Sequence, residues 1–256
     1  MLTDSYDNIY DFDHDAAGAL KLDAPFAPSG ERQATKMLEL AGVGEDDLLY
    51  DLGCGDGQII VLAARDFGAR AVGVELDPQR LEEARQRARW NGVRHKLTLL
   101  EENLFTVDIS KATVVTLYLL PEINLTLRPR LLRELAPGTR IVSHAFDMAE
   151  WKPDEVVEGR GAKFFLWIVP AAVAGTWQWK TPDGRICRVE LEQEYQEVSG
   201  RAWMDEQPAR LHSARLVGTR LELMIQAEDA AAPQSFVSRF IDGRLVPAAG
   251  QPMAVA

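Results

Sequence analysis

The sequence predicts a doubly wound α/β domain followed by a small antiparallel β domain. Residues 48–57 run from an apolar strand through alternating glycines into a helical pattern, which is a common beginning of a parallel sheet with a ligand site. Strand-like and helix-like segments then alternate along the chain. Beyond Pro170 the apolar period changes from 3.6 to 2, which is typical of antiparallel strands. We therefore expect two domains, residues 1–170 and residues 171–256.

The glycine-rich turn is a predicted ligand site. Three alternating glycines follow the first strand: Gly53, Gly55 and Gly57. They place backbone N–H groups and a helix N-terminus at the carboxyl end of a strand, where open α/β sheets bind ligands. The next predicted strand, residues 71–75, ends in Glu75, and a carboxylate about 20 residues after such a turn can accept both hydroxyls of a ribose. The ligand should therefore carry a nucleoside.

The glycine spacing distinguishes two kinds of nucleoside ligand. A dinucleotide turn has the spacing G-x-G-x-x-G, because its third glycine lets the helix pack closely beside the pyrophosphate. Gln58 stands at that third position, and the spacing is instead G-x-G-x-G. Asp51, in the strand before the turn, would repel a pyrophosphate but suits a ligand ammonium group. A nicotinamide oxidoreductase is therefore the less favoured alternative.

The other elements of the first domain follow from apolar spacing and from start and stop residues. A helix from the N-cap candidate Ser29 to about Leu40 precedes the first strand, and Asp77-Pro78 has the residue types that begin a helix. Further strands are expected at residues 96–100, 113–119, 139–145 and 163–169. A helix is expected before the strand at 139–145. Its arginines are expected on a solvated face: Arg128, Arg130 and Arg133.

The sequence Asp-Leu-Gly-Cys-Gly-Asp-Gly at residues 51–57, with Glu75 at the end of the next strand, resembles the first motif of the class I S-adenosylmethionine-dependent methyltransferases. The resemblance implies a Rossmann-like doubly wound methyltransferase sheet and S-adenosyl-L-methionine as cofactor. The residues it places at the cofactor are Asp51, Gly53, Cys54, Gly55, Gly57, Glu75, Leu76, Asn103, Leu104 and Tyr118. In this family the position of Asn103 contacts the adenine amino group and usually holds Asp. A turn asparagine is the alternative for Asn103, and a small filler is the alternative for Cys54.

Four motifs narrow the resemblance. They are Pro-Phe-Ala-Pro-Ser at 25–29, the glycine motif, Glu-Asn-Leu-Phe at 102–105 and Tyr-Leu-Leu-Pro-Glu at 118–122. Together they are similar to motifs of bacterial relatives of the FAM173-type lysine methyltransferases, over about residues 25–150. The resemblance implies methyl transfer to an unidentified acceptor, with a protein lysine as a candidate. Tyr118 and Glu122 would orient the acceptor or help to remove its proton. Alternatively, Glu122 complements the dipole at a helix N-terminus.

The second domain is expected to aid docking or dimerisation and not chemistry. Strands are predicted at residues 175–180, 188–195, 201–204, 211–216, 220–226 and 236–241, with hairpin turns at Asp183-Gly184, Val217-Gly218 and Asp242-Gly243. The four histidines lie far apart, and none stands at metal-ligand spacing from a cysteine, so no metal is expected. Of the four, His144 is the candidate to lie near the pocket, with a structural role as its alternative. A non-catalytic cofactor-binding protein, whose β domain binds a partner, is the alternative function.

The charge and the residue composition indicate which partners the protein binds and in which cellular compartment it works. The net charge of −11 argues against non-specific nucleic-acid binding, which requires neutralised phosphates. Two cysteines make no disulfide framework, and the sequence has neither a signal-peptide pattern nor the ~20 apolar residues that a membrane span needs. We therefore expect a cytoplasmic protein, with a homodimer as a candidate state, and the resemblance implies a bacterial source. The acidic and aromatic residues 1–24 would form either a lid over the cofactor or a partly ordered tail.

Overall fold

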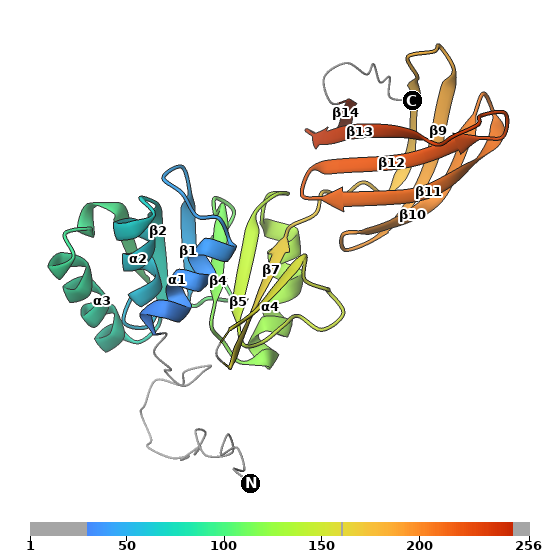
Figure 1. Cartoon of the computed structure of the whole chain (residues 1–256). Helices are drawn as coiled ribbons and strands as arrows, with labels where there is room; N and C mark the ends of the chain where they lie inside the picture. The colour runs from blue at the N-terminus through green and yellow to red at the C-terminus, as the bar shows by residue number, and fades with distance from the viewer. Residues whose placement is uncertain (1–29, 160, 248–256) are drawn as a thin grey trace, which may run out of the picture.

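The computed structural model describes residues 30–159 and 161–247, which form two seven-stranded sheets (Figure 1). Sheet A consists of β1 (Leu48–Leu52), β2 (Arg70–Glu75), β3 (Leu97–Glu101), β4 (Val114–Leu117), β5 (Arg140–His144), β6 (Glu155–Gly159) and β7 (Ala162–Ile168). Its helices are α1 (Glu31–Leu40), α2 (Gln58–Asp66), α3 (Pro78–Trp90) and α4 (Pro121–Glu134), with a 3-10 turn, η1, at Arg94–Lys96. Residues 1–24, with a lid and a partly ordered tail as the two alternatives, and the motif at 25–29 lie outside the described residues.

Sheet A has the strand order β3-β2-β1-β4-β5-β7-β6. The neighbours from β3 to β5 are parallel, and β7 runs antiparallel to β5. The chain builds outward from β1 to β3 and then returns to place β4 on the other side of β1. This reversal is a topological switch point, and open α/β sheets bind ligands outside the carboxyl ends of the strands there. Those ends are Leu52 of β1 and Leu117 of β4.

Helices cover both faces of sheet A. One core joins α1, α2 and α3 to the sheet and includes Leu38, Ile60 and Ala88. The other core joins α4 to the opposite face through Ile123 and Leu127. The result is a three-layer α/β/α domain whose parallel strands are buried on both sides, as parallel strands usually are.

Sheet B is an antiparallel meander in which every strand pairs with its neighbours in the sequence. Its strands are β8 (Gly175–Lys180), β9 (Ile186–Glu194), β10 (Glu197–Met204), β11 (Gln207–Val217), β12 (Arg220–Ala227), β13 (Gln234–Ile241) and β14 (Arg244–Pro247). Alternate residues bury one face: Leu221, Leu223 and Ile225 are at most 1% exposed. The sheet curls toward a barrel (Figure 1). The expected fold class, a doubly wound α/β sheet with an antiparallel β sheet after it, is confirmed.

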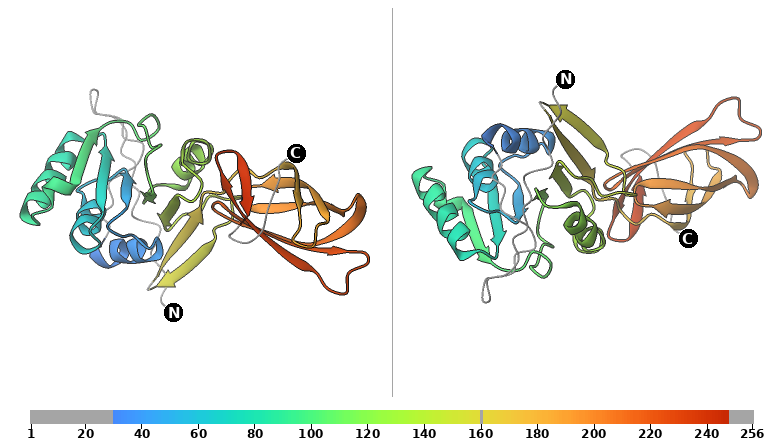
Figure 2. Two further views of the ribbon diagram at one scale, coloured as in Figure 1. Left: turned by 90° about the horizontal axis from the view of Figure 1, so that it is seen from above. Right: turned by 90° about the horizontal axis from the view of Figure 1, so that it is seen from below.

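Sheet B lies beside sheet A and is not stacked on it (Figures 1 and 2). Because β7 is antiparallel to β5, its last residue, Ile168, pairs with Arg140 at the start of β5. The chain therefore leaves for sheet B at the amino edge of the parallel strands, opposite the glycine-rich turn. Two turns of sheet B contact this region: Ala171 N donates to Gly218 O at 2.8 Å, and Tyr195 stacks on Trp151 at 6.0 Å between ring centroids.

The helix starts agree with the sequence in one case and differ in another. Asp77 caps α3, because its Oδ1 accepts a hydrogen bond from Gln79 N at 2.8 Å, and Pro78 is the first helical residue, as expected. The N-cap of α1 is Gly30, so the prediction of Ser29 as N-cap is wrong. The strand β6 was not expected from the sequence. The expected boundary at residues 170 and 171 falls in the segment between β7 and β8, and independent folding of the two parts stays a prediction.

Candidate active site

Backbone hydrogen bonds to β2 hold the glycine-rich turn at the carboxyl end of β1. Gly53 N and Cys54 N both donate to Val74 O, at 2.9 and 3.0 Å. Positive φ values occur at all three glycines: 80° at Gly53, 50° at Gly55 and 79° at Gly57. This region favours glycine. A Cβ at Gly53 would lie 2.9 Å from Leu119 Cδ2, so a side chain there would clash with Leu119, which packs against the turn.

Glu75 ends β2 and directs its carboxylate at the turn. Its Oε2 accepts a hydrogen bond from Gly55 N at 3.0 Å. Its Oε1 accepts from Leu76 N at 2.8 Å and from Asp77 N at 3.0 Å. An ionised carboxylate has about four acceptor positions, so about one remains for a ligand. Glu75 is therefore fixed by three backbone donors and can accept about one ligand hydroxyl, where the sequence argument allowed two.

Asp51 is buried in β1, with 3% of its surface exposed. Its Oδ1 accepts a hydrogen bond from Thr116 Oγ1 of β4 at 2.7 Å. Burial, opposed by this hydrogen bond and assisted by the charges of Glu75 and Asp56, raises the pKa of Asp51 to about 7. No Lys, Arg or His within the described residues forms an ion pair with it. A buried carboxylate of this kind fits a ligand that brings a positive charge.

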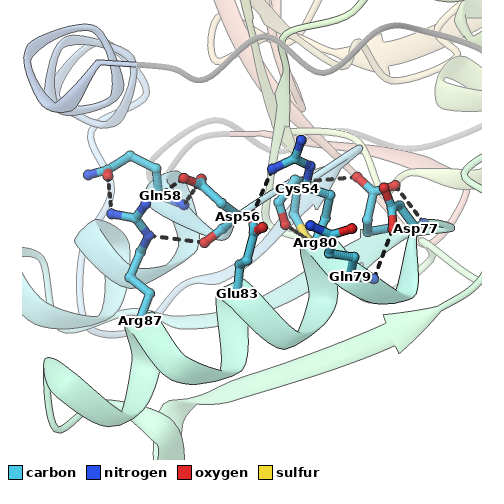
Figure 3. Close-up of polar contacts among 10 residues, drawn as sticks. Cys54, Asp56, Gln58, Asp77, Gln79, Arg80, Glu83 and Arg87 are labelled. Atoms are coloured by element: carbon cyan, nitrogen blue, oxygen red, sulfur yellow. Dashed lines mark hydrogen bonds and ion pairs between the residues drawn. The ribbon is translucent and has the colours of Figure 1, made fainter.

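Arg87 of α3 connects the turn to the helix (Figure 3). Its Nε donates to Asp56 O at 3.0 Å, its Nη1 donates to Gln58 Oε1 at 2.6 Å, and it forms an ion pair with the Asp56 carboxylate. A Cβ on Gly57 would lie 2.8 Å from Ala84 Cβ, so glycine at this position lets α3 approach. Sequence reasoning missed Arg87, because it is 31 residues from Asp56 and no local motif marks it.

Cys54 fills the space between the turn and β2. It is 6% exposed, and its Sγ lies 2.7 Å from the place where a Cβ on Gly73 would stand. Burial raises the pKa of the Cys54 thiol well above its ordinary value, so the thiol stays neutral. These observations favour the small-filler interpretation of its side chain, and a contact of Cys54 with the cofactor stays a prediction.

The segment after β3 is a tight turn centred on Asn103. Asn103 Oδ1 accepts a hydrogen bond from Phe105 N at 2.7 Å, as the turn interpretation requires. Leu104 packs against the core on the α4 face of the sheet. Arg130 donates to Leu104 O at 2.7 Å and also to Val107 O, and its side chain is 11% exposed. The prediction that Arg130 is solvated is therefore wrong. Contacts of Asn103 and Leu104 with adenine stay predictions.

Tyr118 and Glu122 both follow β4, but in different environments. Tyr118 directly follows the last residue of β4 and stacks on His144, with 4.2 Å between ring centroids. Glu122 is exposed in the first turn of α4, where a carboxylate complements the helix dipole. Both interpretations of Glu122 stay open. The structure therefore brings Asp51, Gly53 and Tyr118 to one edge of the sheet.

The described residues show neither a metal site nor a membrane-spanning helix. Residues 30–159 and 161–247 contain no group of three or more side chains that could hold a metal ion. In the same part of the chain, no helix has both the length and the apolar character needed to cross a membrane.

The chain matches a family model and several curated proteins. The model of the ANTKMT methyltransferase domain matches residues 51–155. A protein-lysine N-methyltransferase of Saccharolobus islandicus is 49% identical over 135 residues, which are 52% of this chain and 84% of that protein. The adenine nucleotide translocase lysine N-methyltransferase of Mus musculus is 34% identical over 139 residues, which are 54% of this chain and 60% of that protein.

A solved structure matches over a similar part of the chain. It is an RNA methyltransferase from Salinibacter ruber in complex with S-adenosyl-L-homocysteine, with 48% sequence identity and a TM-score of 0.57. The match covers 57% of this chain and 96% of that one. The family model ends at residue 155, before sheet B begins at Gly175.

Proposed function

The chain belongs to the family of S-adenosylmethionine-dependent methyltransferases that includes the protein-lysine N-methyltransferase of Saccharolobus islandicus, and we propose that it methylates the ε-amino group of a protein lysine. The resemblance inferred from the glycine motif is thereby confirmed, and with it a methyltransferase activity. The two alternatives, a nicotinamide oxidoreductase and a non-catalytic cofactor-binding protein, are set aside. The lysine acceptor is the part of this assignment that needs an experiment.

The proposal of methyl transfer rests mainly on the residues at the carboxyl ends of the parallel strands of sheet A. Asp51 is a buried carboxylate with a raised pKa, which suits the ammonium group of S-adenosylmethionine and not a pyrophosphate. Glu75 keeps about one acceptor position for a ribose hydroxyl. Gly53, which has no side chain, lets Leu119 pack against the turn. The residues of this edge therefore fit the cofactor, which supplies a methyl group made electrophilic by its sulfonium.

The chain has two tasks in an in-line displacement. The first is to hold the acceptor nitrogen at attack distance from the methyl carbon, and such positioning can supply about 7 kcal/mol or more of the barrier. The second is to remove a proton, because a lysine ammonium has no free electron pair. Tyr118 and Glu122 are the nearest candidates to orient the acceptor and to receive that proton, directly or through water.

Two observations support a protein acceptor. The two curated relatives described above are named for methylation of lysines, and the first of them for protein lysines. The chain also carries a net charge of −11, which attracts a basic lysine-bearing partner and repels the phosphates of RNA. Because the solved relative is named as an RNA methyltransferase, RNA is the alternative acceptor that an experiment must distinguish from a protein lysine.

Labelling a lysate decides between these acceptors. The protein would be incubated with methyl-labelled S-adenosylmethionine and a lysate of a strain that lacks the gene, with Asp51→Ala as the inactive control. We expect that protease releases the label and that ribonuclease does not. Acid hydrolysis of the labelled material should yield methyl-lysine. Label removed by ribonuclease and resistant to protease would show that the acceptor proposal is wrong.

A further inference from the structure

Three aromatic rings stack in a row at the carboxyl edge of sheet A. Tyr118 follows β4, His144 ends β5, and Phe164 is the residue of β7 that pairs with His144. The ring centroids of Tyr118 and His144 are 4.2 Å apart with 26° between the ring planes, and those of His144 and Phe164 are 4.9 Å apart with 15°. The imidazole therefore has one ring on each face, and Tyr118 is the end of the row nearest β1.

The His144 ring is buried without the hydrogen bond that usually orients a histidine. It is 7% exposed, and its Nδ1 is buried with no hydrogen-bond partner among the described residues. An unsatisfied buried nitrogen costs about 1–3 kcal/mol, and a native protein that retains one needs a reason for it. Burial also lowers the pKa of His144. The ring is therefore neutral near pH 7, and the stack, not a hydrogen bond to Nδ1, orients it.

The backbone around His144 is fixed in an unusual conformation. The next residue, Ala145, has φ 70°, a left-handed value that costs a non-glycine residue about 1–2 kcal/mol. Ala145 N donates to Lys163 O at 2.8 Å, which ties β5 to β7. On the other side of the strand, Ser143 Oγ donates to Phe146 O at 2.7 Å and accepts from Asn124 Nδ2 at 3.1 Å. Strain retained by such surrounding bonds is typical of functional sites.

We propose that His144 is a positioning residue of the acceptor site: supported by Phe164, its ring holds Tyr118 at the β1–β4 switch point, where an acceptor amine meets the methyl group. The inference rests on the proposed function, since it assigns Tyr118 to the acceptor. A neutral ring suits this place, because the site must receive a sulfonium and an amine that begins as a cation, and a charged imidazole would repel both.

Two substitutions distinguish the contribution of the His144 ring from that of its nitrogen atoms. His144→Ala removes the stack, whereas His144→Phe keeps a flat uncharged ring and removes both nitrogens. We expect His144→Ala to lower single-turnover methylation about tenfold or more, because misplacement by about 1 Å can cost that much, with the cofactor dissociation constant within twofold of wild type. His144→Phe should restore most of the rate. His95→Ala, at an exposed histidine of η1, is the matched control.

A double-mutant cycle tests whether His144 acts through Tyr118. If it does, adding His144→Ala to Tyr118→Ala should cause little further loss of rate, because the ring to be held is already gone. A readout that needs no acceptor is the NMR spectrum of protein labelled at its tyrosine rings. The Tyr118 resonances, assigned from Tyr118→Phe, should move toward unstacked values in His144→Ala and stay near wild type in His144→Phe.

Several results would overturn the inference. A normal rate in His144→Ala, unmoved Tyr118 resonances, or additive losses in the cycle would each do so. Equal loss of rate in His144→Phe and His144→Ala, with Tyr118 still stacked in the former, would mean that an imidazole nitrogen acts directly. If the wild-type protein labels no protein in the lysate, the proposed function fails instead, and the tyrosine spectra still decide whether His144 orders Tyr118.

Discussion

Asp51→Asn should make the protein more stable while it weakens the cofactor site. The carboxylate is 3% exposed, and Thr116 Oγ1 is its hydrogen-bond donor at 2.7 Å. Asn has the same shape and keeps an oxygen that can accept this hydrogen bond, so the substitution removes little except the charge. Burial disfavours the ionised form of the carboxylate in the native protein. It therefore raises the pKa of Asp51 to about 7 from an ordinary value of 3.8.

The size and sign of the effect follow from proton linkage. The folded protein binds the Asp51 proton more tightly than the unfolded chain does, so the free energy of unfolding falls as pH rises from about 4 to about 7 and then levels off. A difference of about three pKa units corresponds to about 4 kcal/mol. Asp51→Asn has no proton to lose at this position. Its free energy of unfolding should therefore exceed that of wild type by up to about 4 kcal/mol at pH 8, and the two values should be equal near pH 3.5.

Urea unfolding at several pH values measures this difference, and Asp47→Asn supplies a control of opposite sign. Asp47 is also buried, at 7% exposure, but it accepts from Thr113 Oγ1 at 2.7 Å and forms an ion pair with Arg140. Removing its charge takes away the only carboxylate that pairs with this guanidinium among the described residues, and should cost about 1–3 kcal/mol. If Asp51→Asn were less stable than wild type at pH 8, then Asp51 would have a partner that stabilises its charge, and the argument for a ligand ammonium would fail.

Three further predictions concern the site and the domains. Glu75→Gln should weaken cofactor binding about tenfold by calorimetry, since it removes the charge that a ribose hydroxyl bonds to; an unchanged dissociation constant would refute the ribose assignment. Residues 1–170 alone should bind cofactor, though with a lower melting temperature because Trp151 loses its contact with Tyr195; a folded truncation that binds nothing would place part of the site in sheet B. Tyr118→Phe and Glu122→Gln should lower turnover with cofactor affinity nearly unchanged; a drop in melting temperature with normal turnover of Glu122→Gln would favour its role at the helix N-terminus.

The sequence predicts the parallel part of sheet A well, because local residue types mark each strand end. Glycines follow β1, and Asp77-Pro78 follows β2 and begins α3 as expected. The sequence does not predict β6, which is an edge strand with mostly exposed residues and therefore lacks the apolar pattern of a buried strand. The sequence does not predict the turn at Asp205 and Glu206 either, because both residues adopt positive φ where a glycine would be expected.

Side-chain contacts between distant elements are the part of the site that sequence reasoning misses. The ion pair of Arg87 with Asp56 and the stack of Tyr118, His144 and Phe164 join strands and helices whose spatial order is set only by the fold. Residue types at strand ends predict which edge binds the ligand. They do not predict which ring packs on which, because that depends on β4, β5 and β7 being neighbours in the sheet.

The placement of sheet B limits what it can contribute to catalysis. The glycine-rich turn and Tyr118 lie at the carboxyl edge of sheet A, whereas sheet B attaches at the amino edge beside Ile168. A strand of five residues, such as β5, separates these edges by about 15 Å. An acceptor that also touched sheet B would have to span that distance, which a folded protein can do more readily than a short lysine peptide.

Two linked contacts raise the effective concentration at the second contact, so removing sheet B should raise KM for a folded acceptor and leave KM for the peptide unchanged. Equal changes in both KM values would show that sheet B acts on the carboxyl edge itself and not by docking the acceptor.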